Sequence, residues 1–401
     1  MKPSSPGFIG KRLTEAREAR GLTITALGEI LGITKQSISQ YEKDLQTPRP
    51  EIMERISNKL NLPKHFFLTP VHELPSNTIF YRSMSAATKR ARTCAERKFY
   101  WLKEIVNYLR TFIVFKEVNF PSIVIKDPFK LSSNDIEHIA TQSRRHWNLS
   151  DNVISHVVML LENNGVIITY GDLDNDKLDA FSEWSEDDNT PYIFLGSDKQ
   201  SAVRSRFDAA HELGHIVLHR SVSKSEFFQT VNHKILERQA HRFASAFLLP
   251  EETFMRDLYA PTLDAFLLLK DKWKVSIGMM IKRCEDIGIV NEDSLNKLWI
   301  NYSRRGWRKK EPLDDKLAIE KPIFLRRCIE LLIDNSIQSR DDILIHLPFA
   351  PSDIEKLAVL PENYMDPKQE KVEPLPLLRK IKEKTELKRE GNSNVIPLHR
   401  K

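Results

Sequence analysis

The sequence predicts a mostly α-helical protein with a small β-sheet, an α+β architecture that begins with a bundle of short helices. Apolar residues recur at helical spacing along most of the chain. Only two short runs, GVIITY at 165–170 and PYIFLG at 191–196, are β-rich and bounded by turn residues, so we expect a pair of strands there. The 401 residues exceed one ordinary core, which favours two or three domains.

Composition and charge are typical of a globular protein without membrane segments. Hydrophobic residues make up 41% and charged residues 29%, and the net charge of +6 permits a polyanionic partner without requiring one. We find no run of about 18 apolar residues and no signal-peptide pattern, so we expect no membrane partner. The three cysteines, Cys94, Cys284 and Cys328, form no CxxC pair, which indicates reduced thiols in a cytoplasmic protein.

Shifts in composition divide the chain into five parts. A Pro-, Ser- and Asn-rich stretch after residue 68 indicates a linker, and NYSRRGWRKKEP at 301–312 indicates a basic, exposed connector. We expect helices across 91–115, across 131–164 with a break at Asn148, and across most of 201–290. The predicted parts are a helix-turn-helix domain at 8–68, a linker at 69–90, a central domain at 91–300, a helical C-terminal region at 301–360 and a loose tail at 361–401.

Two short helices joined by a tight turn are predicted within the N-terminal domain. Thr23 is a good N-cap for the first helix, Gly32 suits the left-handed position that ends it, and Thr34 caps the second. Ile38 and Tyr41 should face the core. This is the helix-turn-helix pattern, in which the second helix enters the major groove of DNA.

The second helix carries polar side chains that can read bases. Glutamine can pair with adenine, lysine with guanine, and serine with bases or phosphate. The candidate residues are Lys35, Gln36, Ser37, Ser39 and Gln40. Arg12 and Arg49 are expected to contact phosphate. The alternative is a small helical packing module whose polar face is only solvated.

The run RGLTITALGEILGITKQSISQYE, followed further on by prolines, resembles the XRE (Cro/C1-type) family of DNA-binding domains over about sixty residues. The resemblance implies a double-stranded DNA operator as partner. Proteins of this kind commonly bind as homodimers on two half-sites one helical turn apart, although the sequence has no clear dimer seam.

A second motif, His211-Glu212-Leu213-Gly214-His215, places ionisable groups in an otherwise apolar helix. Residues at i and i+4 share one face of a helix, so the two imidazoles can bind one metal ion. This is the spacing of HExxH zinc peptidases, in which zinc lowers the pKa of a water and the glutamate takes its proton. Glu212 is therefore the candidate catalytic base. Two surface histidines that flank a glutamate, without a metal, are the alternative.

A catalytic zinc needs a third protein ligand and one open position. The candidates are Glu237, His241 and His219. His219 lies on the same helix as His211 and about 12 Å away along its axis, which one ion can rarely bridge. Glu237 lies on the next predicted helix, LERQAHRFASAFLLP, and would complete a His₂Glu site, so it ranks first. His241 and His219 follow, and we expect them to orient ligands or substrate.

Together, RSRFDAAHELGHIVLH and ERQAHRFASAFLLP resemble the ImmA/IrrE family of zinc metallopeptidases, and the likeness extends over residues 80–310. It implies a zincin-like domain, a Zn²⁺ cofactor held by His211, His215 and Glu237, and a repressor- or antitoxin-like protein as substrate. His241 stands where the family usually has asparagine, which leaves the expected ligands intact but changes their surroundings.

The two resemblances imply a DNA-binding transcriptional regulator with a fused zinc peptidase domain. One alternative is a purely DNA-binding regulator whose zinc site is structural or senses a ligand, without proteolysis. These two functions share every ligand and differ in whether Glu212 does chemistry. A third is a peptidase whose helix-turn-helix binds another protein.

Overall fold

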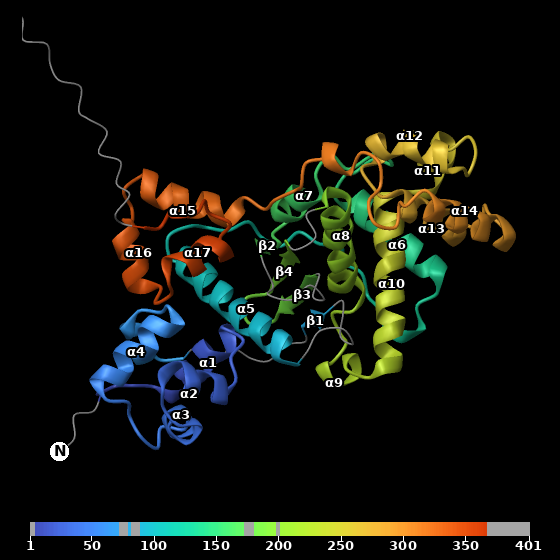
Figure 1. The fold of residues 1–401 in the computed structure, drawn as a ribbon. Coiled ribbons are helices and arrows are strands. Elements are labelled where there is room, and N and C mark those ends of the chain that lie inside the picture. Colours follow the sequence, from blue (N-terminus) through green and yellow to red (C-terminus); the bar gives the residue numbers. More distant parts are fainter. Residues whose placement is uncertain (1–4, 72–78, 82–88, 172–179, 198–200, 367–401) are drawn as a thin grey trace, which may run out of the picture. The chain divides into compact units, whose positions relative to one another are not determined.

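The N-terminal helices form a bundle around a shared apolar core (Figure 1). The computed structural model describes residues 5–71, 79–81, 89–171, 180–197 and 201–366. The bundle consists of α1 (Gly10–Ala19), α2 (Ile24–Leu31), α3 (Lys35–Glu42), α4 (Pro50–Leu60) and a 3-10 helix, η1 (Lys64–Leu68).

The turn between α2 and α3 has the predicted chemistry. Thr23 and Thr34 each accept a hydrogen bond of 3.1 Å from the backbone N–H three residues later, which caps the two helices. Gly32 ends α2 with a φ of 60°, a left-handed conformation that glycine adopts at little cost. Ile38 and Tyr41 are buried in the core. The predicted helix-turn-helix pattern is therefore confirmed.

A four-stranded sheet lies in the following part of the chain. Its strands are β1 (Phe80–Tyr81), β2 (Ile167–Gly171), β3 (Ala180–Ser185) and β4 (Thr190–Gly196), in the order β1-β3-β4-β2. β2 runs parallel to β4, and β3 runs antiparallel to both of its neighbours. The two predicted strands are confirmed as β2 and β4. β3 was not predicted, and β1 falls in the predicted linker, of which 72–78 and 82–88 lie outside the described residues.

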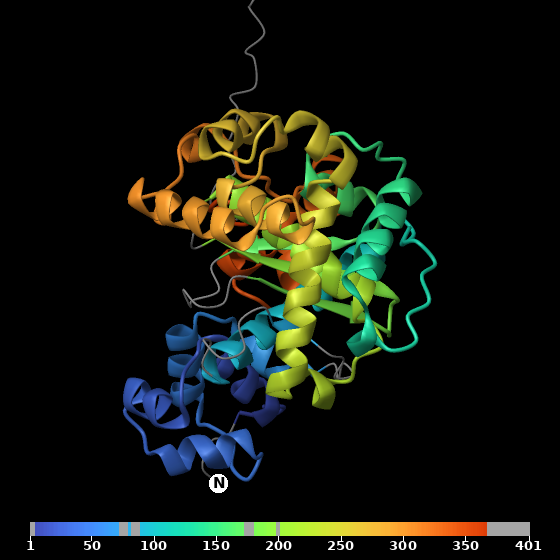
Figure 2. The same cartoon turned by 90° about the vertical axis from the view of Figure 1, so that its right-hand side faces the viewer.

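Helices of four to 22 residues pack on this sheet and on one another (Figures 1 and 2). They are α5 (Lys89–Arg110), α6 (Ser133–His146), α7 (Val157–Asn163), α8 (Ala202–Leu218), α9 (Lys224–Phe227), α10 (Thr230–Leu248), α11 (Glu251–Asp257), α12 (Leu263–Trp273) and α13 (Ile277–Asp286). α8 packs against β3 and β4, and α10 packs along α8 and α6. The break expected at Asn148 follows α6, where this residue has a φ of 53°. The predicted mostly helical fold with a small sheet is confirmed.

α14 (Glu292–Arg304) crosses the predicted boundary at residue 300. The C-terminal region then adds a 3-10 helix η3 (Asp314–Lys316), α15 (Phe324–Asp334), α16 (Arg340–His346) and α17 (Pro351–Leu357). α17 packs against β2, where Thr169 Oγ1 donates a 2.7 Å hydrogen bond to the carbonyl of Leu357. None of the described helices is long and apolar enough to cross a bilayer.

Two expectations about this region need correction. The connector at 301–312 is not exposed throughout, because Tyr302 and Glu311 are buried and Glu311 pairs with Lys270 at 2.6 Å. The tail is not loose from residue 361. Met365 is fully buried and its N–H donates a 2.8 Å hydrogen bond to Glu355, while 367–401 lie outside the described residues.

Candidate metal centre and DNA-binding surface

Two imidazoles and one carboxylate converge between α8 and α10. His215 Nε2 lies 3.1 Å from His211 Nε2 and 3.1 Å from Glu237 Oε1, and His211 Nε2 lies 3.4 Å from Glu237 Oε2. All three donor atoms lie within 4.8 Å of one another. Both histidines are fully buried. Two imidazole nitrogens and a carboxylate form a donor set that zinc takes in catalytic sites, so the residues fit such an ion.

Gly214 explains how the two helices come close enough to form this group. A Cβ atom at Gly214 would lie 3.2 Å from Ala240 Cα and 3.2 Å from the Ala240 carbonyl oxygen, which is closer than most such contacts. The small residues at these two positions let α10 approach α8. Glu237, one turn before Ala240, is thereby brought to the two histidines of α8.

A chain of hydrogen bonds orients the His215 ring. Gln239 Nε2 donates to the carbonyl of Pro128 at 2.8 Å, so Gln239 Oε1 faces His219 Nε2 at 2.9 Å. His219 Nε2 must therefore carry the proton, and Nδ1 of a neutral His219 accepts from His215 Nδ1 at 3.0 Å. Burial, and then the neighbouring His215 ring, hold the pKa of His219 well below its usual value, in keeping with this neutral form. His215 Nε2 is left with its lone pair toward Glu237.

Glu212 lies beside the group on the face of α8 that meets the sheet. Its side chain is fully buried, and Ser182 Oγ donates a 2.6 Å hydrogen bond to Glu212 Oε2. Ser182 lies on β3 opposite Phe80 of β1. The Phe80 ring stacks on the His215 ring, with centroids 5.3 Å apart and an interplanar angle of 13°. This ring covers one face of the His215 imidazole.

His241 lies next to the group without joining it. It is exposed, its ring centroid lies 4.6 Å from that of His211, and it stacks on Phe207 at 5.4 Å. Among the described residues, the group of donors that could hold an ion is His211, His215 and Glu237. His219 contacts the group through His215. The structure thus brings the first-ranked candidate into the group and leaves the other two beside it.

Four residues of this region were not singled out from the sequence. They are Ser182, Gln239, Phe80 and His233, the last of which has Nε2 at 3.8 Å from Glu237 Oε1. His233 carries a signal that the sequence offers, since it precedes Glu237 by four residues on one helix face. Ser182 and Phe80 lie on strands that precede α8 in the chain, so no spacing within one helix predicts that they contact the metal centre.

The predicted base-reading residues lie on α3. Lys35 and Gln36 are exposed, and the other three are half-exposed. The Ser37 hydroxyl lies 3.0 Å from Thr34 Oγ1, so it takes part in the cap of α3. Arg49 is exposed at the start of α4.

Arg12 does not reach the surface, so its expected phosphate contact is wrong. Its side chain is fully buried, and its guanidinium pairs with Glu15 at 3.0 Å and with Glu104 of α5 at 3.2 Å. It also donates to the carbonyls of Thr69 and Pro70 at 3.1 and 2.7 Å. Through these contacts Arg12 stabilises the packing of the N-terminal bundle against α5.

Known families match both of these regions. Residues 13–67 match a helix-turn-helix family, and residues 161–285 match the IrrE N-terminal-like domain of the M78 peptidase family. The chain joins an XRE-type helix-turn-helix domain to an IrrE/ImmA-like domain of the M78 peptidase family. Both resemblances inferred from the sequence are confirmed. The M78 match contains His211, Glu212, His215 and Glu237.

Curated relatives match shorter stretches. The chain is 33% identical over 67 residues to the HTH-type transcriptional regulator SinR of Bacillus subtilis (strain 168), which covers 16% of this chain and 60% of SinR. It is 35% identical over 60 residues to the HTH-type transcriptional regulator ImmR of the same organism, or 15% of this chain and 47% of ImmR. An uncharacterized HTH-type transcriptional regulator of Sinorhizobium medicae (strain WSM419) is 39% identical over 59 residues, or 15% and 42% of the two chains. The chain thus spans between four and six tenths of the length of these relatives.

Proposed function

We propose that this protein is a DNA-binding transcriptional regulator whose M78 domain is a zinc-dependent peptidase that cleaves a repressor- or antitoxin-like protein. The observation that carries the proposal is the convergence of His211, His215 and Glu237, with the Glu212 carboxylate beside them. A purely structural zinc site is usually closed by four protein ligands, whereas three ligands leave a position for chemistry.

A zinc ion held by His211, His215 and Glu237 would supply Lewis-acid activation for hydrolysis. Water adds to the carbonyl carbon of the scissile peptide, and the C–N bond then breaks. Glu212 takes the proton from the water and passes it to the leaving nitrogen. The hydrogen bond from Ser182 to Glu212 Oε2 holds the carboxylate in place for both transfers.

The DNA-binding half of the proposal rests on the helix-turn-helix match and on relatives named as transcriptional regulators. Lys35, Gln36 and Gln40 of α3 would contact base edges, and Arg49 would contact phosphate. Ser37 and Ser39 would form hydrogen bonds to bases or phosphate. Two copies on half-sites one helical turn apart would follow the usual geometry of this motif.

A reporter assay combined with a gel tests the proposal. Wild-type protein and the Glu212→Gln variant are each produced beside a repressor encoded near the regulator gene, and repressor length and promoter output are followed. The proposal predicts that the repressor is cut and the promoter responds only with wild type. Unchanged promoter output with an intact repressor in both strains would instead support a zinc-bearing regulator without proteolysis.

The metal centre has its own test. Purified wild-type protein should hold about one zinc per chain. His211→Ala or His215→Ala should lose it, Glu237→Gln should weaken it severely, and Glu212→Gln should retain it. Full retention in Glu237→Gln together with loss in His241→Ala would move the third ligand to His241.

A further inference from the structure

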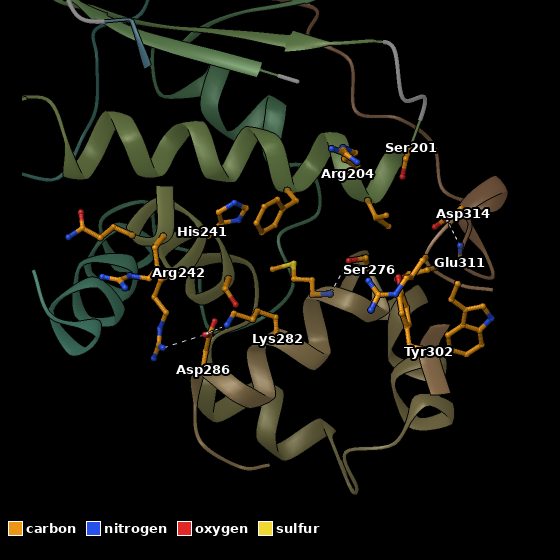
Figure 3. Close-up of a pocket in the computed structure, with 18 of the residues that line it drawn as sticks. Ser201, Arg204, His241, Arg242, Ser276, Lys282, Asp286, Tyr302, Glu311 and Asp314 are labelled. Carbon is orange, nitrogen blue, oxygen red and sulfur yellow. Dashed lines mark hydrogen bonds and ion pairs between the residues drawn. The ribbon is translucent and has the colours of Figure 1, made fainter. Parts of the chain in front are cut away.

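A large cavity opens beside the metal centre and has no role in the chemistry described above (Figure 3). Its volume is about 1220 Å³, and it is lined by α6, α8 and α10 on one side and by α13 and the 302–314 segment on the other. Figure 3 shows Arg204 on α8 at one side of the space and Lys282 on α13 at the opposite side.

The cavity adjoins the metal centre through two aromatic rings. His241 and Phe207 both line it, and their ring centroids lie 4.6 and 6.2 Å from that of His211. Gln239, the end of the hydrogen-bond chain to His215, lines it as well. The Phe80 ring, which does not belong to this lining, stacks on His215. His241 and Phe207 are the rings that both contact His211 and line the cavity, so a chain that enters the metal centre from the cavity would pass His241.

The lining carries an excess of positive charge. Seven cationic side chains line it, namely Arg204, Arg238, Arg242, Lys282, Arg308, Lys309 and Lys310, against three carboxylates. Two of these carboxylates, Glu311 and Asp314, already pair with the buried Lys270 at 2.6 and 2.5 Å. The third, Asp286, lies 3.6 Å from Arg242 and 3.7 Å from Lys282. Arg242, Lys282 and Lys310 also pair with acidic residues outside the lining, namely Glu137, Glu285 and Asp315, at 2.6, 2.9 and 2.7 Å. The positive charge that an entering ligand would meet therefore comes mainly from the exposed Arg238, Arg308 and Lys309.

The same lining has apolar surface between the charges. Leu131, Ile136, Phe207 and Met279 contribute to it. A ligand that fits both features carries carboxylates together with aliphatic or aromatic groups. Concave sites of this kind bind ligands through apolar contact and a few placed polar groups.

From this arrangement we infer that the cavity binds an acidic segment of the protein substrate, in which Asp or Glu alternates with apolar side chains, and delivers it past His241 to the metal centre. The inference rests on the proposed peptidase function and names its substrate class. The same cations would attract a nucleic acid, which could use the apolar part of the lining only through base stacking. Tyr302 is buried and packs edge-on against Trp299 and Trp307, so its ring offers no face for base stacking.

Peptide binding to the Glu212→Gln variant tests this without cleavage. The probe is a fluorescein-labelled twelve-residue peptide of alternating Glu and Leu, followed by anisotropy, beside the same peptide with Gln in place of Glu and a labelled twelve-nucleotide oligothymidine. The exposed pair Arg238→Glu/Lys309→Glu removes cavity charge, and Lys59→Glu/Lys297→Glu makes the same change of charge on α4 and α14. Circular dichroism checks that all variants fold.

The inference predicts that the acidic peptide binds most tightly, and that added salt weakens it. The cavity double variant should raise its dissociation constant about tenfold or more, because each reversed charge removes an attraction and adds a repulsion. The control pair should change it less than about twofold. Equal loss in both pairs, no binding of the acidic peptide, or preference for the glutamine peptide or the oligonucleotide would overturn the inference. Incubation of the acidic peptide with zinc-loaded wild type separates the two proposals, because binding without cleavage would count against the peptidase function and leave the cavity assignment standing.

Discussion

His219 shows at the scale of one residue how a side chain that is not a ligand can prepare a metal site. His219 Nδ1 accepts a hydrogen bond from His215 Nδ1–H, and His219 Nε2–H donates one to Gln239, so the His215 Nε2 lone pair faces Glu237. Partners of this kind fix the tautomer and orientation of a ligating histidine.

The His219→Ala variant should therefore hold zinc more weakly. Loss of such a partner typically lowers metal affinity about 10–100-fold. Competition with a fluorescent chelator measures the affinity, and His146→Ala, an exposed histidine on α6, is the control and should match wild type. An affinity for zinc that is unchanged in His219→Ala would show that the hydrogen-bond chain does not orient the site.

What the sequence predicts at this scale depends on whether partners are local. His211, Glu212 and His215 follow from spacing within one helix. Arg12 was misplaced because its burial depends on Glu104, which lies on α5 and far along the chain. A basic residue in a short amphipathic helix looks exposed when only its own helix is considered.

At the scale of elements, a buried carboxylate joins α7 to α15. Glu162 accepts hydrogen bonds from the N–H groups of Ile323 and Phe324 at 3.0 and 2.9 Å, where α15 begins. Burial raises the pKa of Glu162 from 4.5 to about 7, against the lowering effect of these hydrogen bonds. The folded protein therefore favours the protonated carboxyl.

This raised pKa predicts a stability that falls as the pH rises. The stabilisation from the protonated form is complete below the unfolded pKa of 4.5 and is lost as the pH passes through the folded value of about 7. Between pH 5 and 8, the free energy of unfolding of wild type should decrease relative to Glu162→Gln by about 3 kcal/mol at most. Urea unfolding of both proteins at several pH values measures this. A constant difference between them would contradict the account.

Some strands could be predicted from the sequence and others could not. β2 and β4 are recognisable because they are short apolar runs between turns. β3 is hidden because it is buried along its whole length yet includes Ser182 and Glu183. Glu183 is tolerated there because Lys103 of α5 pairs with it in the core. A strand whose polar residues have buried partners shows no alternation of apolar and polar residues.

At the scale of the whole molecule, operator binding and proteolysis are assigned to different parts of the chain. Gln36→Ala and Gln40→Ala should each cost about 1–3 kcal/mol in binding to the preferred sequence if the side chain reads a base. Arg49→Ala should weaken binding to all DNA sequences alike. It should also reduce, by about one, the slope of the logarithm of the binding constant against the logarithm of the salt concentration. Footprinting and salt titration measure these effects, and zinc content should not change. A double glutamine variant that protects its operator like wild type would show that α3 does not read the sequence.

The central claim is that Glu212 performs chemistry at a zinc site formed by His211, His215 and Glu237. The most direct measurement titrates zinc into metal-free protein and follows the rate at which a purified candidate repressor is cut. For wild type, the rate should rise with bound zinc and level off at about one ion per chain. Glu212→Gln should bind the same amount of zinc and lose about 10²–10⁴-fold or more of the rate, because an amide cannot accept the proton. Equal cleavage by the two proteins at full zinc loading, or an intact repressor with zinc-saturated wild type, would contradict the account.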